Sequence, residues 1–226
     1  MSGKLFVIEG LDGSGKATQA ERFFQKLEHD GRNPVKLSFP RYDDDSSVLV
    51  RGYLAGEYGQ NPEDVGAFAA SLFFAIDRYV SFKKDWGEKY ADGGIFVSDR
   101  YTTSNAVYQM SKLPETEWDA FLSWLSDLEY TKLAIPSPDL VIYLDIPVRD
   151  SAKLMLERYG GDKSKMDIHE RDIRYQEKSR RAALYCAGLY GWNVINCFDG
   201  GKMRPKEEIA AEIYLIAEKD GLLDIC

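Results

Sequence analysis

Residues 4–19, KLFVIEGLDGSGKATQ, constrain the fold of this chain more than any other segment. They begin with apolar and β-branched side chains at residues 5–8, which are typical of a short strand buried on both faces. A glycine-rich loop follows, and residues 17–28 then have helix-forming composition with apolar side chains on one face. Strand, glycine-rich loop and helix in this order are the context in which a protein holds phosphate groups.

The loop matches the spacing G-x-x-x-x-G-K at Gly10, Gly15 and Lys16. In such a loop the backbone N–H groups converge on the phosphates, the helix N-terminus adds its dipole, and the lysine reaches the β and γ oxygens. A glycine turn without a ligand is the alternative, but the flanking elements favour a nucleoside triphosphate. The loop residues expected to bind ATP are Gly10, Gly13, Ser14, Gly15, Lys16, Ala17 and Thr18.

Length, composition and charge exclude several classes of protein. The chain has 226 residues, 44% of them hydrophobic, which suits a single domain over residues 1–226. Its longest apolar runs fall short of the roughly 20 residues of a membrane span, so no membrane partner is expected. The net charge of −8 argues against a nucleic acid partner, which would need a basic surface.

Three cysteines, Cys186, Cys197 and Cys226, are odd in number and lack the spacing of metal ligands. They indicate reduced thiols rather than a disulfide framework. The first residues run directly into a strand, so no signal or transit peptide is expected. Together these features predict a cytoplasmic protein.

Short strands alternate with helical segments along the rest of the chain. Beyond the first strand, we expect strands at residues 35–39, 95–98, 139–145 and 193–198. Helical patterns cover residues 48–58, a long region from residue 62, and residues 115–130, 148–158, 167–190 and 205–219. This alternation predicts a three-layer α/β architecture, with a five-stranded parallel sheet flanked by helices.

Residues that directly follow strands are candidates for ligand contacts, because ligands of parallel sheets bind beyond the carboxyl ends of the strands. Arg41 follows the second strand, and Asp99 with Arg100 follows the third. An aspartate in that place can hold Mg²⁺ or its waters beside a phosphate loop, and a helix N-cap is the alternative role. We expect Asp99 to hold the metal, through water.

Two further patterns carry both a functional and a structural interpretation. Arg158, Lys163 and Lys165 surround a pair of glycines, which suits a short lid over residues 158–167 that closes on phosphates, although a solvated loop fits too. In the helical region, Phe74 lies one turn before Arg78 and could stack on a base. Residue pattern alone does not decide whether Phe74 stacks on a base or packs in the core.

Five separated stretches occur together and in order: EGLDGSGK at residues 9–16, FPR at 39–41, LFFAIDR at 72–78, DRYTTSNAVYQ at 99–109 and PDLVIYLD at 138–145. In this combination the chain resembles the thymidylate kinase family of nucleoside monophosphate kinases. The resemblance implies the fold of P-loop NTPases with a short lid. It also implies transfer of the γ-phosphoryl group of ATP to the 5′-phosphate of dTMP, with Mg²⁺ as cofactor, in a homodimer.

The resemblance assigns roles to individual residues. Phe74 would stack on thymine, Arg78 would bond its carbonyl edge, Asp12 would hold the sugar 3′-hydroxyl, and Tyr108 would crowd the 2′ position. The residues expected at the dTMP site are Asp12, Arg41, Arg51, Phe74, Arg78, Arg100, Ser104, Asn105, Tyr108 and Gln109. The residues expected to be catalytic are Lys16, Asp99, Arg100 and Arg158, with Lys163 and Lys165 as further cations near ATP.

The chain departs from the family pattern at three places. Ala17 stands where a serine or threonine normally ligates Mg²⁺, and we expect a water oriented by Asp99 to replace that ligand. Gly13 stands where some members have an arginine, so the transition-state cation is expected from the lid, with Arg158 first. Asn105 stands where a small residue is expected, which leaves the base preference open.

Two other activities fit parts of this pattern. A deoxynucleoside kinase would accept a sugar hydroxyl instead of a phosphate, but Arg41, Arg51 and Arg100 favour a phosphorylated acceptor such as dTMP or another monophosphate. A nucleotide-binding protein without catalysis would explain Ala17, whereas Lys16 and Arg100 argue for a working enzyme.

Overall fold

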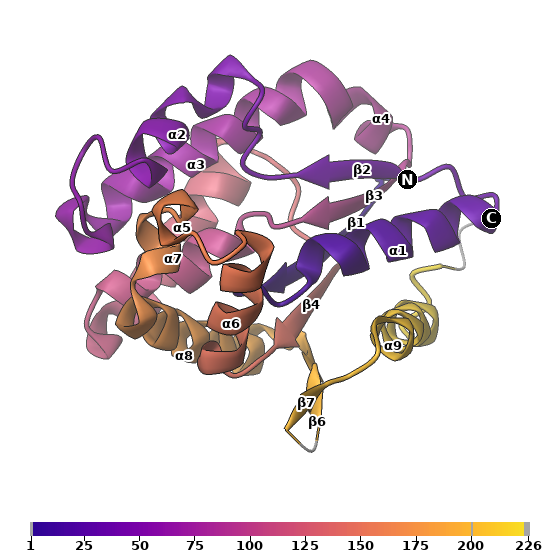
Figure 1. Cartoon of the computed structure of the whole chain (residues 1–226). Coiled ribbons are helices and arrows are strands. Elements are labelled where there is room, and N and C mark those ends of the chain that lie inside the picture. Colours follow the sequence, from indigo (N-terminus) through magenta and orange to yellow (C-terminus); the bar gives the residue numbers. More distant parts are fainter. Residues whose placement is uncertain (1, 200, 224–226) are drawn as a thin grey trace.

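The computed structural model describes residues 2–199 and 201–223. Five parallel strands form one sheet in the order β2-β3-β1-β4-β5, and helices cover both of its faces (Figure 1). The strands are β1 Lys4–Gly10, β2 Val35–Ser38, β3 Ile95–Asp99, β4 Leu140–Asp145 and β5 Asn193–Asn196. The predicted three-layer α/β architecture is confirmed.

Strand β1 lies at the centre of the sheet because its side chains are apolar toward both faces. Phe6 and Ile8 enter the core beneath helices α1 (Lys16–His29) and α9 (Lys206–Lys219). Leu5 and Val7 alternate with them and enter the core on the opposite face. Helices α3 (Ala67–Ser81), α5 (Trp118–Ser126) and α8 (Ile173–Tyr190) lie on that opposite side (Figure 1).

The remaining elements are short. The α-helices are α2 Val48–Leu54, α4 Gly87–Ala91, α6 Val148–Arg158 and α7 Ile168–Arg171. The π-helical segments are η3 Phe82–Trp86, η4 Asn105–Gln109 and η7 Asp127–Lys132. The 3₁₀ segments are η1 Asp45–Ser47, η2 Pro62–Asp64, η5 Met110–Lys112, η6 Glu115–Glu117 and η8 Lys163–Lys165. No helix of the described residues is both long enough and apolar enough to cross a membrane.

The continuous helix predicted over residues 167–190 is wrong. Asp172 has an extended backbone with φ −99° and ψ 97°, and this residue separates α7 from α8. Its carboxylate accepts hydrogen bonds from the backbone N–H groups of Arg174 and Tyr175, so it caps the second helix. The residues on both sides of Asp172 follow a helical pattern. The helix breaks at Asp172 because its side chain bonds to the backbone there and competes with helical hydrogen bonding.

The predicted last strand is too long, and a small hairpin was missed. Strand β5 ends at Asn196, and β6 (Phe198–Asp199) then pairs antiparallel with β7 (Lys202–Met203). Strands of two residues carry no detectable alternation, so sequence pattern could not reveal them.

Candidate active site

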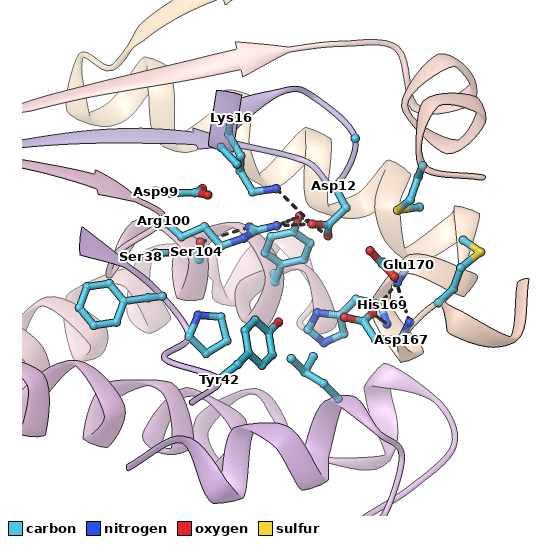
Figure 2. A pocket seen from close by; sticks show the side chains of 18 of the residues that line it. Asp12, Lys16, Ser38, Tyr42, Asp99, Arg100, Ser104, Asp167, His169 and Glu170 are labelled. Carbon is cyan, nitrogen blue, oxygen red and sulfur yellow. Dashed lines mark hydrogen bonds and ion pairs between the residues drawn. The ribbon is translucent and has the colours of Figure 1, made fainter. Parts of the chain in front are cut away.

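A cavity of ≈ 870 Å³ opens beyond the carboxyl ends of β1 and β3. Its walls come from the glycine-rich loop, the segment after β2, helix α3, the segment after β3, and the chain from α6 to α7. Figure 2 shows side chains from these separate segments pointing into one space. The cavity therefore lies where sequence reasoning placed the ligands of a parallel sheet.

The glycine-rich loop is shaped by two glycines with positive φ. Gly13 has φ 83°, and a Cβ there would lie 2.5 Å from the carbonyl oxygen of Ser151. Gly15 has φ 85° and caps α1, which begins at Lys16. The loop and the first residues of this helix line the cavity, which is the position that a phosphate site requires.

Lys16 and Arg100 meet at Asp12 (Figure 2). The Lys16 Nζ atom lies 3.1 Å from Asp12 Oδ1, and Arg100 Nη2 donates to the same oxygen. Burial alone would raise the pKa of Asp12, but the charges of Arg100 and Lys16 outweigh it and hold that pKa well below its usual range. The Asp12 carboxylate is therefore kept ionised between two basic side chains that line the cavity.

Arg100 has a strained backbone with φ 65°, in the left-handed region that non-glycine residues seldom adopt. Its N–H group donates to Ile8 O at 3.1 Å, and Ser98 Oγ donates to its carbonyl at 2.6 Å. Glu9, fully buried at the end of β1, accepts from Arg100 Nη1 at 3.4 Å and from Ser104 Oγ at 2.7 Å. These contacts aim the guanidinium into the cavity.

Glu9 is a residue that sequence reasoning missed. Its carboxylate also accepts from Thr103 Oγ1 at 2.7 Å, so it joins β1 to the segment after β3. The available signal was a charged residue inside an otherwise apolar buried strand, which is costly unless the charge has partners.

The region around Asp99 fits a bound cation. Asp99 lines the cavity, and its Oδ1 atom is buried without a hydrogen-bond partner among the described residues. An unpaired buried carboxylate oxygen needs a ligand, and Mg²⁺ or one of its waters supplies the right chemistry. Ser14 Oγ is likewise buried and unpartnered, whereas Ala17 lines the cavity without an oxygen to offer.

The opposite end of the cavity is aromatic and amide-rich. Phe74, Arg78, Asn105 and Gln109 line it, and the Oε1 atom of Gln109 is buried without a hydrogen-bond partner in the described chain. Arg78 is 1% exposed and forms an ion pair with Glu129, a buried residue of η7 that sequence reasoning missed. Planar apolar and hydrogen-bonding groups together suit a nucleobase.

Tyr108 lines the cavity and contacts residues from three other segments of its wall. Its hydroxyl donates to Asp12 Oδ2 at 3.1 Å, and the Arg100 guanidinium lies 5.0 Å from its ring centroid. On the other side the ring stacks on His169, with centroids 5.4 Å apart and planes 12° apart. Ser104 lines the same wall and donates to Glu9.

Arg41 and Arg51, predicted near an acceptor phosphate, do not belong to the cavity lining, whereas their neighbour Tyr42 does. Arg41 forms ion pairs with Asp44 and Asp85. The Nη1 group of Arg51 donates to carbonyl oxygens at 2.8 and 2.9 Å, within the segment between β2 and α2. Phosphate binding by these two arginines stays a prediction.

The predicted lid cations occupy the chain from α6 to α7. Arg158 and Lys165 line the cavity, and Arg158 Nη2 lies 3.2 Å from Glu170 Oε1. The Tyr159 hydroxyl donates to the same carboxylate at 3.1 Å. The side chain of Lys163 and the whole of Cys226 lie outside the part of the chain that the structure describes.

Asp167 and His169, beside Glu170, also line the cavity and were missed (Figure 2). Burial, together with the charge of Asp12, raises the pKa of Asp167 to about 7. Burial, together with the charge of Lys112, lowers the pKa of His169 to about 3, so the imidazole is neutral. The His169 Nε2 atom lies 2.7 Å from the Tyr53 hydroxyl. Only the fold brings this charged helical segment to the phosphate loop.

Comparisons with known proteins agree with this geometry. The model of a family described as thymidylate kinase matches residues 8–198. A thymidylate kinase of Mycobacterium tuberculosis is 31% identical over 195 residues, which cover 83% of this chain and 87% of that protein. A probable thymidylate kinase of Pyrococcus abyssi is 30% identical over 223 residues, covering 98% and 99%.

Among solved structures, a thymidylate kinase from Candida albicans matches with a TM-score of 0.70. The match covers 97% of this chain and 92% of the Candida chain at 21% sequence identity. It shows that the two chains share one fold, and the predicted P-loop NTPase fold is confirmed.

Proposed function

This chain belongs to the thymidylate kinase family, and we propose that it transfers the γ-phosphoryl group of ATP to the 5′-phosphate of dTMP, giving dTDP. The observation that carries this proposal is the single cavity that joins a phosphate loop to an aromatic and amide-lined end. Lys16, Arg100 and Asp12 all line this cavity and are joined by ion pairs. Such a space holds a donor and an acceptor nucleotide end to end.

Phosphoryl transfer needs alignment and charge neutralisation more than covalent chemistry. Lys16 would hold the β and γ oxygens of ATP against the start of α1. Arg100 would bridge the acceptor and donor phosphates, because a guanidinium can bond two oxygens at once. Both cations bond to Asp12, and substrate phosphates would compete with that carboxylate for them.

The acceptor would lie across the opposite end of the cavity. Phe74 would stack on thymine, and Arg78 would bond its carbonyl edge. Asp12 would accept a hydrogen bond from the sugar 3′-hydroxyl. Tyr108, held between Arg100 and His169, would leave no room for a 2′-hydroxyl and so would disfavour ribonucleotides.

Mg²⁺ fits beside the phosphate loop, where Asp99 would hold it through water. The unpaired Oδ1 atom of Asp99 supports this assignment. A bound Mg²⁺ would neutralise charge on the transferring phosphate oxygens. Ala17 removes one direct oxygen ligand, and Mg²⁺ commonly keeps water in such positions.

Residues 1–226 would form one catalytic domain, with residues 158–167 as its lid. Arg158 would bring a cation to the γ-phosphoryl group when it leaves Glu170, and Lys163 and Lys165 would add charge near ATP. The enzyme would work in the cytoplasm, where the thiols of Cys186 and Cys197, both free in the structure, stay reduced.

A homodimer is proposed through one face of α3. Phe68, Leu72 and Ile76 follow one another at intervals of one helical turn, and they are 45%, 42% and 42% exposed. An apolar stripe of this kind is costly in water and suits a self-complementary helix pair.

The test is ADP release from ATP and Mg²⁺ with dTMP, dUMP, dCMP, dGMP, UMP or thymidine as acceptor. Turnover highest with dTMP supports the proposal. Turnover on thymidine itself would identify a nucleoside kinase instead. ATP binding without turnover on any acceptor would indicate a protein that only binds nucleotides.

A further inference from the structure

Glu129 lies directly behind the base end of the cavity without lining it. It belongs to η7, its side chain is fully buried, and it contacts two residues that do line the cavity, Arg78 and Asn105. The carboxylate binds Arg78 side-on, with Nε donating to Oε2 at 2.9 Å and Nη2 donating to Oε1. Two of the five guanidinium N–H groups, one on Nε and one on Nη2, are therefore committed.

The third nitrogen of Arg78, Nη1, keeps a free N–H group. Its recorded acceptor is the carbonyl oxygen of Tyr101 at 3.4 Å. Since Nη1 carries two hydrogens, the second remains available. Arg78 lines the cavity, so the uncommitted hydrogens of Nη1 and Nη2 are the donors that it can offer to a ligand there.

Asn105 has its amide orientation fixed by two acceptors. Its Nδ2 group donates to Glu129 Oε1 and to the carbonyl oxygen of Ser71, each at 3.1 Å. Neither partner can donate, so a flipped amide would set its own oxygen against two acceptor oxygens. The Asn105 carbonyl oxygen must then lie on the remaining side, toward the cavity that this residue lines.

We propose that Glu129 is the positioning residue for base selection, because it holds a hydrogen-bond donor of Arg78 beside an acceptor of Asn105. This inference rests on the proposed function of the same cavity. A donor next to an acceptor complements the imide edge of thymine or uracil, where C4=O accepts and N3–H donates. Cytosine presents the reverse order, with a donating amino group beside the accepting N3. The Glu129 carboxylate thereby rejects cytosine without touching the substrate.

The decisive variant is Glu129→Gln, which keeps the size of the side chain but adds a donor. Its amide N–H₂ would face Asn105 or Arg78, so Asn105 would lose the constraint that keeps its oxygen toward the base. We expect the ratio of kcat/KM for dCMP to kcat/KM for dTMP to rise about 10-fold to 100-fold. A change of this size corresponds to the free energy of one buried hydrogen bond whose donor and acceptor are reversed. Asp145→Asn is the matched control, because it removes a carboxylate that binds Arg180 through two hydrogen bonds of 2.7 Å outside the cavity lining.

An unchanged dCMP-to-dTMP ratio in soluble Glu129→Gln protein would overturn the proposal, even if both activities fell together. If that variant does not fold, the wild-type enzyme is tested with N3-methyl-dTMP, which lacks the N3–H donor. We expect its kcat/KM to fall at least about 10-fold below that of dTMP. Equal use of both nucleotides would contradict an oriented Asn105 acceptor. Failure of the wild type to use dTMP at all would instead refute the proposed function.

Discussion

Asp12 is the residue on which side chains from three separate segments of the cavity wall converge. It accepts from Lys16, Arg100 and Tyr108, which come from α1, the segment after β3 and η4. The charges of Arg100 and Lys16 keep this carboxylate ionised, and the three donors together fix its position. A single aspartate in the glycine-rich loop thus sets the geometry of residues far away in the sequence.

Ala17 gives the first prediction at this scale. If a water replaces the missing hydroxyl ligand, Ala17→Ser should lower the Mg²⁺ concentration needed for half-maximal activity while kcat changes by less than about threefold. Asp99→Asn should raise that concentration, because it weakens the carboxylate that orients the water. Titration of activity with Mg²⁺ at saturating ATP and dTMP measures both effects. An identical Mg²⁺ requirement in the wild type and Ala17→Ser would show that no ligand is missing.

His169 gives a second prediction, which concerns the pH dependence of stability. Its pKa is about 3 in the folded protein and near 6.5 in the unfolded chain, so between these values the unfolded chain binds a proton that the folded protein does not. Stability should therefore fall as the pH drops below about 6.5. From pH 7 to pH 5 we expect the wild type to lose about 2 kcal/mol more than His169→Gln.

Urea unfolding of both proteins at the two pH values measures this difference. Glutamine keeps a partner for the Tyr53 hydroxyl, and the nearby charged groups Asp12, Arg100 and Lys112 are common to both proteins. Equal losses of stability on acidification would mean that His169 is not held neutral.

At the scale of elements, the chain from α6 to α7 combines a helix end, two positive-φ glycines and a capped short helix. Gly160 and Gly161 have φ 62° and 86°, and a Cβ at either would meet nothing within 4 Å. Asp167 caps α7 by accepting from the N–H groups of His169 and Glu170. The glycines give this segment backbone freedom and the cap keeps α7 intact, which supports the proposal of a lid here.

Arg158 supplies the corresponding prediction. Arg158→Ala should lower kcat about 100-fold and leave KM for dTMP within about threefold, because the cation would act on the transferring phosphoryl group and not on the bound acceptor. Arg149→Ala is the control, since Arg149 lies in the first turn of the same helix and is exposed. Steady-state kinetics with dTMP varied at saturating ATP separates the two constants. A fall in kcat/KM caused by KM alone would remove Arg158 from the transfer step.

At the scale of the whole molecule, the stripe of Phe68, Leu72 and Ile76 on α3 lies on the same helix as Phe74 and Arg78. One face of α3 thus reaches the cavity while another remains exposed. Association through the exposed face would hold rigid the helix that carries Phe74 and Arg78, the residues proposed to bind the base.

We predict that the proposed homodimer becomes a monomer in Leu72→Lys, because this substitution places a charge in the middle of an apolar contact. Leu215→Lys on α9 is the control, since Leu215 is 50% exposed but lies away from α3. Light scattering after size-exclusion chromatography gives the mass of each variant. A wild-type monomer at micromolar concentration would refute the dimer, and a dimeric Leu72→Lys would refute this interface.

The sequence by itself determined where strands and helices fall along the chain, the glycine-rich loop and the family. These features depend on local periodicity and on motifs of adjacent residues. Strands β1 to β4, the start of β5 and the loop around Lys16 were predictable in this way, whereas the positions of Phe74, Asn105 and Tyr108 at the cavity were predicted only through the family resemblance.

Only the tertiary structure decided which partners those residues have. Glu129 binds Arg78 across 51 positions, Arg100 reaches Asp12 across 88, and His169 reaches Tyr53 across 116. Arg41, which follows a strand as a ligand-binding residue should, forms ion pairs outside the cavity lining instead. Contacts of this range depend on how the elements pack, since local pattern specifies which face of an element is buried but not which distant side chain will meet it.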